Sequence, residues 1–273
     1  MRPVTLAMHQ SVRRDRELME YISLGATVEQ IPKIGFGTWQ YRGGAGVLKR
    51  AAELGAGFVD TAEAYGTEPI VGREIAAFRD EMFVATKVSA SNLRFDDVIE
   101  HAEASLRRLQ VSVIDLYQVH WPNPDIPIAE TMRAMETLVA EGKVRFIGVS
   151  NFSPSQMKEA QDSLKDNPLA ANQVRYSLFA REIEDGVLPY CQENDITVIA
   201  YTPIARGDFD SPGGALREVA AEVGATPAQV MLSWVISHEG VMAIPKTDSV
   251  ERVDEAVASV DIKLSADLKE RLV

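Results

Sequence analysis

Four side chains that could act together in proton transfer follow three short apolar runs of the sequence. Residues 59–66 read V-D-T-A-E-A-Y-G and place a carboxylate, Asp60, five residues before a phenol, Tyr65. The run M-F-V-A-T-K-V carries Lys87 near its end, and I-D-L-Y-Q-V-H-W carries His120. Taken alone, each residue is more often an ordinary turn, surface or structural residue. Held at one point, the four could pass a proton to a substrate oxygen.

The chemistry of this set depends on how its charges are arranged. A phenol with a pKa near its usual value of ~10 is a poor acid at neutral pH, and a neighbouring cation lowers that pKa. We expect Lys87 to be this cation for Tyr65 and Asp60 to be its counter-charge. His120 is expected to orient a carbonyl and to stabilise charge that develops on its oxygen. Such a site protonates an alkoxide but has no nucleophile, so the hydride must come from elsewhere.

Schiff-base chemistry and metal binding are two alternatives to proton transfer for these residue types. A lysine at the end of a barrel strand can form a Schiff base, which makes Lys87 a candidate aldolase nucleophile, but a salt-bridged cationic lysine is not nucleophilic. The four histidines, His9, His101, His120 and His238, show no H-E-x-x-H or other paired spacing, so no metal site is predicted. The single cysteine, Cys191, excludes a disulfide framework and indicates a reducing, cytoplasmic compartment.

The elements that must position these residues alternate along the chain. Eight short apolar runs are predicted strands, at residues 34–38, 58–60, 82–86, 114–119, 146–149, 171–174, 198–200 and 241–244. Amphipathic runs between and after them are predicted helices, at residues 46–54, 68–78, 95–109, 128–141, 154–163, 185–194, 215–223, 227–237 and 249–259. Strands that are almost wholly apolar belong to a parallel sheet covered by helices. The fold class is therefore α/β, a (β/α)8 TIM barrel, preceded by a β-hairpin at residues 21–34.

Length and charge limit the class of protein further. The chain has 273 residues, which suits one barrel domain over residues 19–273, with residues 1–18 as an N-terminal extension. A net charge of −12 argues against nucleic acid or an anionic membrane as a partner, and no apolar run is long enough to span a bilayer. No G-x-G-x-x-G follows a strand and opens a helix, so a Rossmann site for a nicotinamide cofactor is not predicted.

Eight short motifs, in order, resemble those of the aldo-keto reductases. They are I-G-F-G-T-W, V-D-T-A-E-A-Y-G-T-E, A-T-K-V, D-L-Y-Q-V-H-W-P, G-K-V-R-F-I-G-V-S-N-F, N-Q-V-R-Y, A-Y-T-P-I and I-P-K-T. The resemblance runs from about residue 20 to about residue 260, roughly nine-tenths of the chain, and is to the short-loop, prokaryotic type. It implies a (β/α)8 barrel that binds NADPH in extended form and reduces aldehydes or ketones to alcohols, as NADP+-dependent alcohol dehydrogenases of this family do.

The resemblance also implies roles for individual residues. The catalytic tetrad falls on Asp60, Tyr65, Lys87 and His120, with Tyr65 as the proton donor. The positions that hold the nicotinamide carboxamide fall on Ser150, Asn151 and Gln173, and the aromatic that stacks on its ring falls on Tyr201. The remaining cofactor positions fall on Thr38, Thr202, Pro203, Ile204, Lys246, Thr247, Arg252 and Glu255. The positions that line the substrate pocket fall on Trp39 and Trp121.

The spacing of two basic residues near the end of the chain predicts a phosphate-binding site independently of the resemblance. Lys246 follows the last predicted strand, and Arg252 lies six residues later at the start of the next helix, so both can reach one phosphate. The resemblance assigns Lys246, Thr247 and Arg252 to the adenosine 2′-phosphate and Glu255 to the adenine. We therefore predict NADPH in preference to NADH.

The chain departs from the family pattern in its loops. W-P-N-P-D-I-P-I and A-R-G-D-F-D-S-P-G-G are short, and little sequence follows the helix predicted at residues 249–259. An open, shallow site with broad and weak substrate binding is the expected consequence. The family resemblance and the absence of an obvious interface motif predict a monomer. The alternative function is a cofactor-binding, redox-sensing subunit with little turnover.

Overall fold

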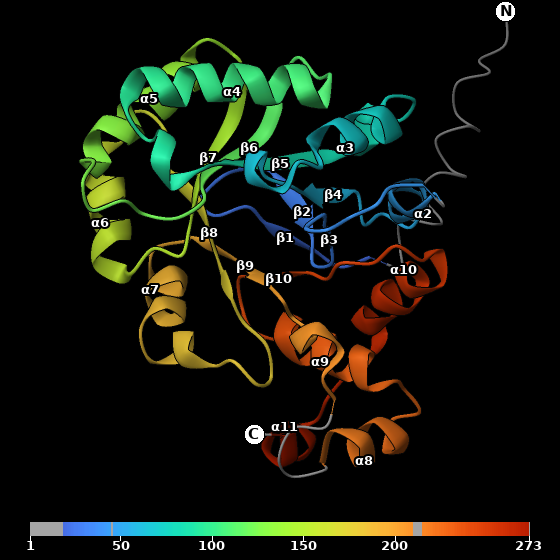
Figure 1. Ribbon diagram of the computed structural model, residues 1–273. Coiled ribbons are helices and arrows are strands. Elements are labelled where there is room, and N and C mark those ends of the chain that lie inside the picture. Colours follow the sequence, from blue (N-terminus) through green and yellow to red (C-terminus); the bar gives the residue numbers. More distant parts are fainter. Residues whose placement is uncertain (1–18, 45, 210–214, 273) are drawn as a thin grey trace, which may run out of the picture.

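Eight parallel strands form the centre of the computed structural model, which describes residues 19–44, 46–209 and 215–272 (Figure 1). In sheet order they are β3 (Phe36–Gly37), β4 (Phe58–Asp60), β5 (Phe83–Val88), β6 (Ile114–Val119), β7 (Val144–Ser150), β8 (Leu169–Arg175), β9 (Thr197–Tyr201) and β10 (Val241–Ile244). The first and last strands meet, because Gly35 N donates to Ala243 O at 2.9 Å and Gly37 N donates to Pro245 O at 3.0 Å. The predicted barrel is confirmed.

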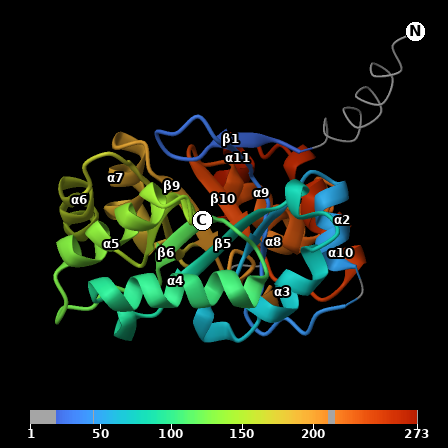
Figure 2. The same ribbon diagram turned by 90° about the horizontal axis from the view of Figure 1, so that it is seen from above.

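Helices surround the strands on the outside (Figures 1 and 2). They are α2 (Val47–Glu53), α3 (Glu68–Ile75), α4 (Phe95–Leu109), α5 (Ile128–Ala140), α6 (Pro154–Ser163), α7 (Val187–Glu193), α8 (Ala215–Glu222), α9 (Pro227–Ile236), α10 (Val250–Val257) and α11 (Ala266–Leu272). The predicted bounds of α4 and α6 are met at both ends. Helix α11 was not predicted, because its seven residues bury only Leu268 and Leu272 and show too little apolar periodicity.

Two helix starts show how local sequence sets element boundaries. The segment T-P-A-Q begins α9 with a capping box, in which Thr226 Oγ1 accepts from Gln229 N at 3.2 Å and Gln229 Oε1 accepts from Thr226 N at 3.0 Å. Proline in the first turn loses no intrahelical hydrogen bond, since that N–H has no partner in a helix. The segment S-P-S-Q begins α6 in the same way.

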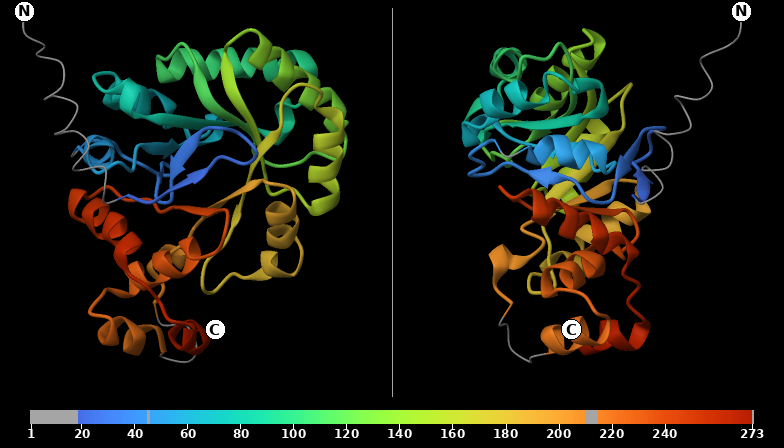
Figure 3. Two further views of the ribbon diagram at one scale, coloured as in Figure 1. Left: turned by 180° about the vertical axis from the view of Figure 1, so that it is seen from behind. Right: turned by 90° about the vertical axis from the view of Figure 1, so that its right-hand side faces the viewer.

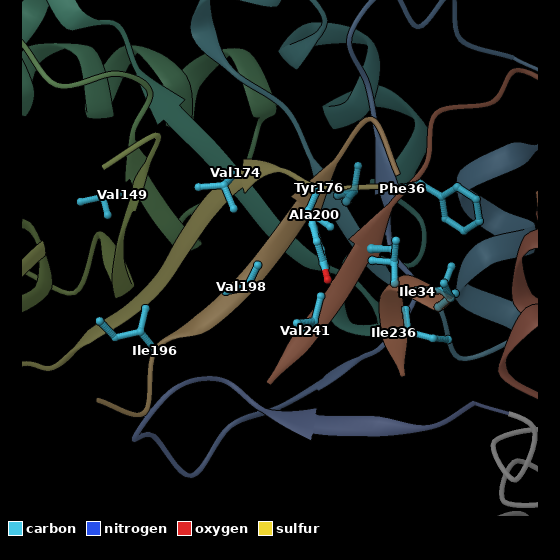
Figure 4. Close-up of a cluster of buried hydrophobic side chains, with 14 of the residues drawn as sticks. Ile34, Phe36, Val149, Val174, Tyr176, Ile196, Val198, Ala200, Ile236 and Val241 are labelled. Atoms are coloured by element: carbon cyan, nitrogen blue, oxygen red, sulfur yellow. The ribbon is translucent and has the colours of Figure 1, made fainter. Parts of the chain in front are cut away.

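Alternate strand residues separate two apolar layers. Val198 and Ala200 on β9 point toward the helices, where Figure 4 shows them with side chains of the neighbouring strands and of α9. Ile199 between them points into the barrel interior. Strands buried on both faces are what a helix-covered parallel sheet requires.

The predicted hairpin closes the barrel at the end where the strands begin (Figure 3). Its strands β1 (Tyr21–Ser23) and β2 (Gln30–Pro32) pair antiparallel. Thr197, the first residue of β9, donates to Ser23 O at 3.0 Å and accepts from Gly25 N at 2.8 Å. Leu24 and Ile31 pack with the barrel interior. The hairpin covers this end of the barrel, so a functional site is expected at the opposite end, where the strands end.

Within the described ranges, no single helix is long and apolar enough to cross a membrane. Helices α8 and α9 satisfy that criterion only as a pair, with a bend of 91° between them. Residues 1–18, predicted as an extension, and part of the loop A-R-G-D-F-D-S-P-G-G lie outside the described residues.

Candidate active site

A cleft of about 1090 Å³ lies at the carboxyl ends of the barrel strands. Every predicted site residue except Lys87 lines it. Strand ends that are far apart in the chain converge here, because all eight strands run in the same direction. The rim is open at Trp39 and Trp121, whose exposed fractions are 47% and 51%.

Lys87 lies beneath the cleft and is fully buried. Its Nζ atom donates to Asp60 Oδ2 at 2.6 Å and to Thr61 O at 2.8 Å. The predicted ion pair between Lys87 and Asp60 is therefore present. A buried ammonium stays charged only when it is paired and hydrogen-bonded, so these contacts keep a cation below the cleft.

Tyr65 stands directly above this cation. It ends the short 3₁₀ helix η2 (Glu63–Tyr65), and Gly66, with a φ of 69°, turns the chain away into α3. Lys87 Nζ lies 5.0 Å from the centre of the Tyr65 ring. The Tyr65 hydroxyl lies 3.4 Å from His120 Nε2, and the two rings meet edge-on. The phenol and the imidazole thus face the same point in the cleft.

Lys87 lowers the pKa of Tyr65, as predicted, but the net shift of that pKa is upward. Burial raises the pKa of the phenol, Lys87 lowers it by charge, and Asp60 raises it again, so that the result lies above the ordinary value of 10.0. Asp60 offsets much of the field of Lys87 because the two are in contact. Tyr65 is therefore held in its protonated form, which is the form that can donate.

His120 is held neutral. Burial and the charge of Lys87 lower the pKa of its imidazole from 6.5 to about 4. A neutral imidazole donates from one ring nitrogen only, and which nitrogen carries the hydrogen is set by its partners. His120 can therefore bind a carbonyl oxygen without adding a positive charge beside Lys87.

The depressed pKa of His120 predicts a pH dependence of stability. Below about pH 6.5 the unfolded chain takes up a proton that the folded protein refuses until about pH 4, so stability falls as pH decreases through this window. We expect His120→Gln to lose less stability than the wild type between about pH 7 and about pH 5. Urea unfolding of both proteins at the two pH values measures this, and the carboxylates common to both cancel. Equal pH dependence in the two proteins would contradict the assignment.

Three predicted cofactor residues form a hydrogen-bonded group on one side of the cleft. Asn151 Nδ2 donates to Ser150 Oγ at 2.9 Å and to the backbone oxygen of His120 at 3.1 Å, and Tyr201 Oη donates to Asn151 Oδ1 at 3.1 Å. Asn151 has a φ of 62°, in the left-handed region that asparagine tolerates better than most residues. These contacts fix an amide and a phenol at the edge of the catalytic group.

Gln173 differs from its expected role in one respect. Its Nε2 atom donates to Asp60 Oδ1 at 2.7 Å, so its amide nitrogen supports the ion pair. Gln118 Nε2 lies 3.5 Å from the same oxygen and was not predicted. Alternation along β6 carries the signal for Gln118, because it shares the inward parity of His120 two residues later.

The predicted residues beyond Tyr201 run along the cleft toward α10. Thr202, Pro203 and Ile204 line it, and Thr202 has a φ of 55°. A β-branched residue in this region is strained, and such residues concentrate at functional turns. Thr38, on the opposite side, is buried and donates to Asp60 O at 3.0 Å.

The basic pair lies at the far end of the same cleft. Lys246 and Arg252 both line it, and Ser249 caps α10 by accepting from Arg252 N at 3.4 Å. Lys246 Nζ contacts Asp248, which offsets part of its charge and was not foreseen. Thr247 Oγ1 accepts from Ser249 N at 3.0 Å and so shapes the turn into the helix.

Glu255, assigned to the adenine region, lines the cleft near α9. Its carboxylate accepts from Thr226 Oγ1 at 2.6 Å. The contact joins the start of α9 to α10 beside the basic pair. Both helices begin at this end of the cleft.

Arg206 lines the cleft but was not among the predicted site residues. It belongs to the connection after β9, and its guanidinium lies 5.3 Å from the centre of the Trp39 ring, on the connection after β3. This contact links two loops across the cleft. One arginine in a short polar loop carries no signal of such a contact, because loop charges are usually solvated.

Comparison with known proteins agrees with this geometry. Residues 33–272 match the model of the aldo/keto reductase family. Methylglyoxal reductase YeaE of Escherichia coli is 38% identical over 250 residues, which cover 86% of this chain and 88% of that protein. A thermostable aldo-keto reductase crystallised with the inhibitor epalrestat is 37% identical, with a TM-score of 0.86 over 93% of this chain and 98% of its own.

A second solved structure, an aldo/keto reductase from Klebsiella pneumoniae in complex with NADP and acetate, is 38% identical. Its TM-score is 0.81, over 92% of this chain and 93% of its own. Fold, cleft and sequence therefore lead to one assignment. This chain belongs to the aldo/keto reductase family.

Proposed function

We propose that the protein reduces small aldehydes or ketones to alcohols with NADPH, with Tyr65 as the proton donor. The observation that carries the proposal is the buried pair of Lys87 and Asp60 beneath a protonated Tyr65 that faces a neutral His120. Bound NADPH supplies the hydride. The chain's own residues supply the proton and the binding of the carbonyl oxygen.

The proton step follows from the positions of these groups. A carbonyl oxygen placed between the Tyr65 hydroxyl and His120 Nε2, which are 3.4 Å apart, can accept a hydrogen bond from each. As charge develops on that oxygen, Tyr65 donates its proton. Lys87 then stabilises the phenolate, and Asp60 keeps Lys87 charged and in place.

The cleft fits the proposed cofactor in size and in chemistry. At about 1090 Å³ it lies just above the usual range of ligand pockets, ~300–1,000 Å³, which suits a ligand as large as a dinucleotide. Ser150, Asn151 and Gln173 offer the hydroxyl and amide groups that a nicotinamide carboxamide needs. Tyr201 offers a ring to stack on, and Lys246 and Arg252 offer charge for a phosphate.

Arg252→Ala is expected to raise the KM for NADPH ~10–100-fold, because a charge-assisted hydrogen bond is worth about 1.5–3 kcal/mol. The KM for NADH should not change, since NADH has no 2′-phosphate. Steady-state kinetics with each cofactor measures both values. Lys158→Ala, which removes an exposed cation paired with Asp162 on α6, is the matched control. Equal losses with NADPH and NADH would contradict a 2′-phosphate role.

For the substrate, we propose compact aldehydes of the methylglyoxal type. The proposal is supported by the methylglyoxal reductase among the relatives and by the two half-exposed tryptophans, Trp39 and Trp121, at the rim. Oxidation of NADPH with methylglyoxal, an aromatic aldehyde and a sugar-derived ketoacid would rank these classes. No turnover with any carbonyl, together with tight NADPH binding, would favour the redox-sensing alternative.

The Schiff-base alternative is disfavoured by a specific observation. Lys87 is fully buried, so it has no access to a substrate carbonyl, and its ammonium group is paired with Asp60, which leaves it non-nucleophilic. Borohydride treatment with substrate and without NADPH should leave Lys87 unmodified.

Three further assignments complete the proposal. We propose that residues 19–273 act as one unit, that the protein works as a monomer, and that it works in the cytoplasm. The last rests on the single buried cysteine, Cys191.

A further inference from the structure

A second carboxylate lies close to Tyr65 but faces away from the cleft. Glu63 begins η2, two residues before Tyr65, and its side chain is 8% exposed. Glu63 Oε1 accepts from Ser89 N at 2.6 Å and from Asn92 Nδ2 at 3.0 Å. Glu63 Oε2 accepts from His101 Nδ1 at 2.6 Å. Nothing in the proton step described above uses these contacts.

The partners of Glu63 join the Tyr65 segment to the strand that carries Lys87. Ser89 follows Lys87 by two residues, directly after β5. The hydrogen bond from Ser89 N therefore connects a residue two before the phenol to a residue two after the ammonium. A shift of Glu63 would change the distance between Tyr65 and Lys87.

Glu68 makes the corresponding connection on the other side of Tyr65. Its side chain is 1% exposed, and its Oε1 atom accepts from Thr86 Oγ1, next to Lys87, at 2.6 Å. Its Oε2 atom accepts from Arg108 Nε at 2.6 Å. The segment around Tyr65 is thus tied to both sides of Lys87.

Helix α4 holds the outer side of both carboxylates. His101 and Arg108 are seven residues apart, which is close to two turns, so they lie on one face of the helix. Arg108 also comes within 3.9 Å of Glu63. Buried carboxylates need such partners, because an unpaired charge away from water is costly.

Glu63 is ionised at neutral pH. Burial raises the pKa of its carboxyl group. The hydrogen bonds from Ser89, His101 and Asn92 lower that pKa by more than burial raises it, so the net shift is downward. The backbone of η2 offers little support of its own, with Tyr65 N donating to Ala62 O at 3.0 Å and Gly66 N donating to Glu63 O at 3.4 Å. The side-chain contacts of Glu63 are therefore a main restraint on where the Tyr65 hydroxyl stands.

We propose that Glu63 is a positioning residue for proton transfer, which holds the Tyr65 hydroxyl in register with Lys87 and His120 through Ser89, Asn92 and His101. The inference rests on the proposed function of Tyr65. It assigns Glu63 no contact with substrate or cofactor.

Glu63→Ala is expected to lower kcat ~10–100-fold, since displacement of a catalytic group by about 1 Å can cost ~100-fold. The dissociation constant for NADPH should stay within about twofold of the wild type, because Glu63 does not line the cleft. Glu63→Gln keeps an oxygen acceptor for Ser89 N and Asn92 and should retain most of kcat. Glu63→Asp keeps the charge but shortens its reach, and it serves as the second test if the alanine variant does not fold.

A matched control separates positioning from general stability. Asp115 is a buried carboxylate with the same pattern of partners: it accepts from Val84 N at 2.8 Å and from Arg79 and Arg145 at 2.7 Å. It lies near the start of β6, at the end of the barrel opposite the cleft. Asp115→Ala should lower the stability of the protein and leave kcat per folded molecule unchanged.

Hydrogen exchange gives a readout independent of turnover. Peptides over residues 61–67 should exchange faster in Glu63→Ala than in the wild type, and they should not do so in Asp115→Ala. Unchanged exchange in Glu63→Ala, or equal loss of kcat in both alanine variants, would overturn the proposal. Tyr65→Phe in the same assay checks the proposed function separately. Full activity there would remove both the donor role of Tyr65 and the need to position it.

Discussion

Tyr65→Phe is expected to lower kcat by about 1,000-fold or more with every carbonyl substrate. The phenylalanine ring keeps the packing against His120 and the position above Lys87, but the substitution removes the hydroxyl that faces His120. General acids contribute typically ~10²–10⁴-fold to rate, and His120, which is held neutral beside Tyr65, is assigned to binding the substrate oxygen and not to donating a proton. Steady-state oxidation of NADPH measures the effect.

Binding of NADPH is the control for this variant. The dissociation constant, measured by fluorescence titration, should remain within a few-fold of the wild type, because the phenol hydroxyl is proposed to act on the substrate oxygen. A Tyr65→Phe variant that binds NADPH and turns over at the wild-type rate would disprove the donor role. Loss of cofactor binding together with loss of activity would show that Tyr65 shapes the cleft instead.

Lys87→Met is expected to produce the largest loss of stability, about 3–5 kcal/mol, and to abolish activity. The substitution removes one partner of a buried ion pair and leaves Asp60 as an uncompensated charge that accepts from Gln173 alone at close range. Methionine has nearly the volume of the lysine stem, so the loss reports on charge more than on packing. Urea unfolding gives the change in the free energy of unfolding.

A double variant separates the two roles of the pair. Adding Asp60→Asn to Lys87→Met removes the stranded charge, and we expect it to restore much of the lost stability, since replacing both partners of a buried pair is often nearly neutral. Activity should stay lost, because no cation remains to stabilise the Tyr65 phenolate. Recovery of turnover in the double variant would show that Lys87 serves only the fold.

The barrel is predictable because its signals are local. Apolar runs such as 114–119 and 241–244 show strand character by themselves, and an all-parallel sheet brings their carboxyl ends to one end of the barrel. Asp60, Lys87 and His120 each stand at or just past such an end, so their convergence follows from chain direction alone. Helix α11 escapes prediction because seven residues with two buried leucines carry too weak a pattern.

The pKa values of the site residues, in contrast, do not follow from short stretches of sequence. The pKa of Tyr65 depends on how deeply the phenol is buried and on how fully Asp60 offsets Lys87, and both quantities are set by contacts between segments that are remote in sequence. The prediction from residue types therefore named the right groups and the lowering effect of Lys87, whereas the net direction of the pKa shift follows from burial.

The sequence by itself determined the barrel, the hairpin before it and the strand-end residues Asp60, Lys87 and His120, because strand periodicity and residue type are written along the chain. The resemblance to the aldo-keto reductases added the predicted cofactor residues. Only the tertiary structure decided that Gln173 supports Asp60, that Arg206 lies against Trp39, and that Glu63 joins the Tyr65 segment to β5. These contacts depend on side-chain direction and on distances of a few ångströms between remote segments. Such distances exist only once the strands and helices have packed together.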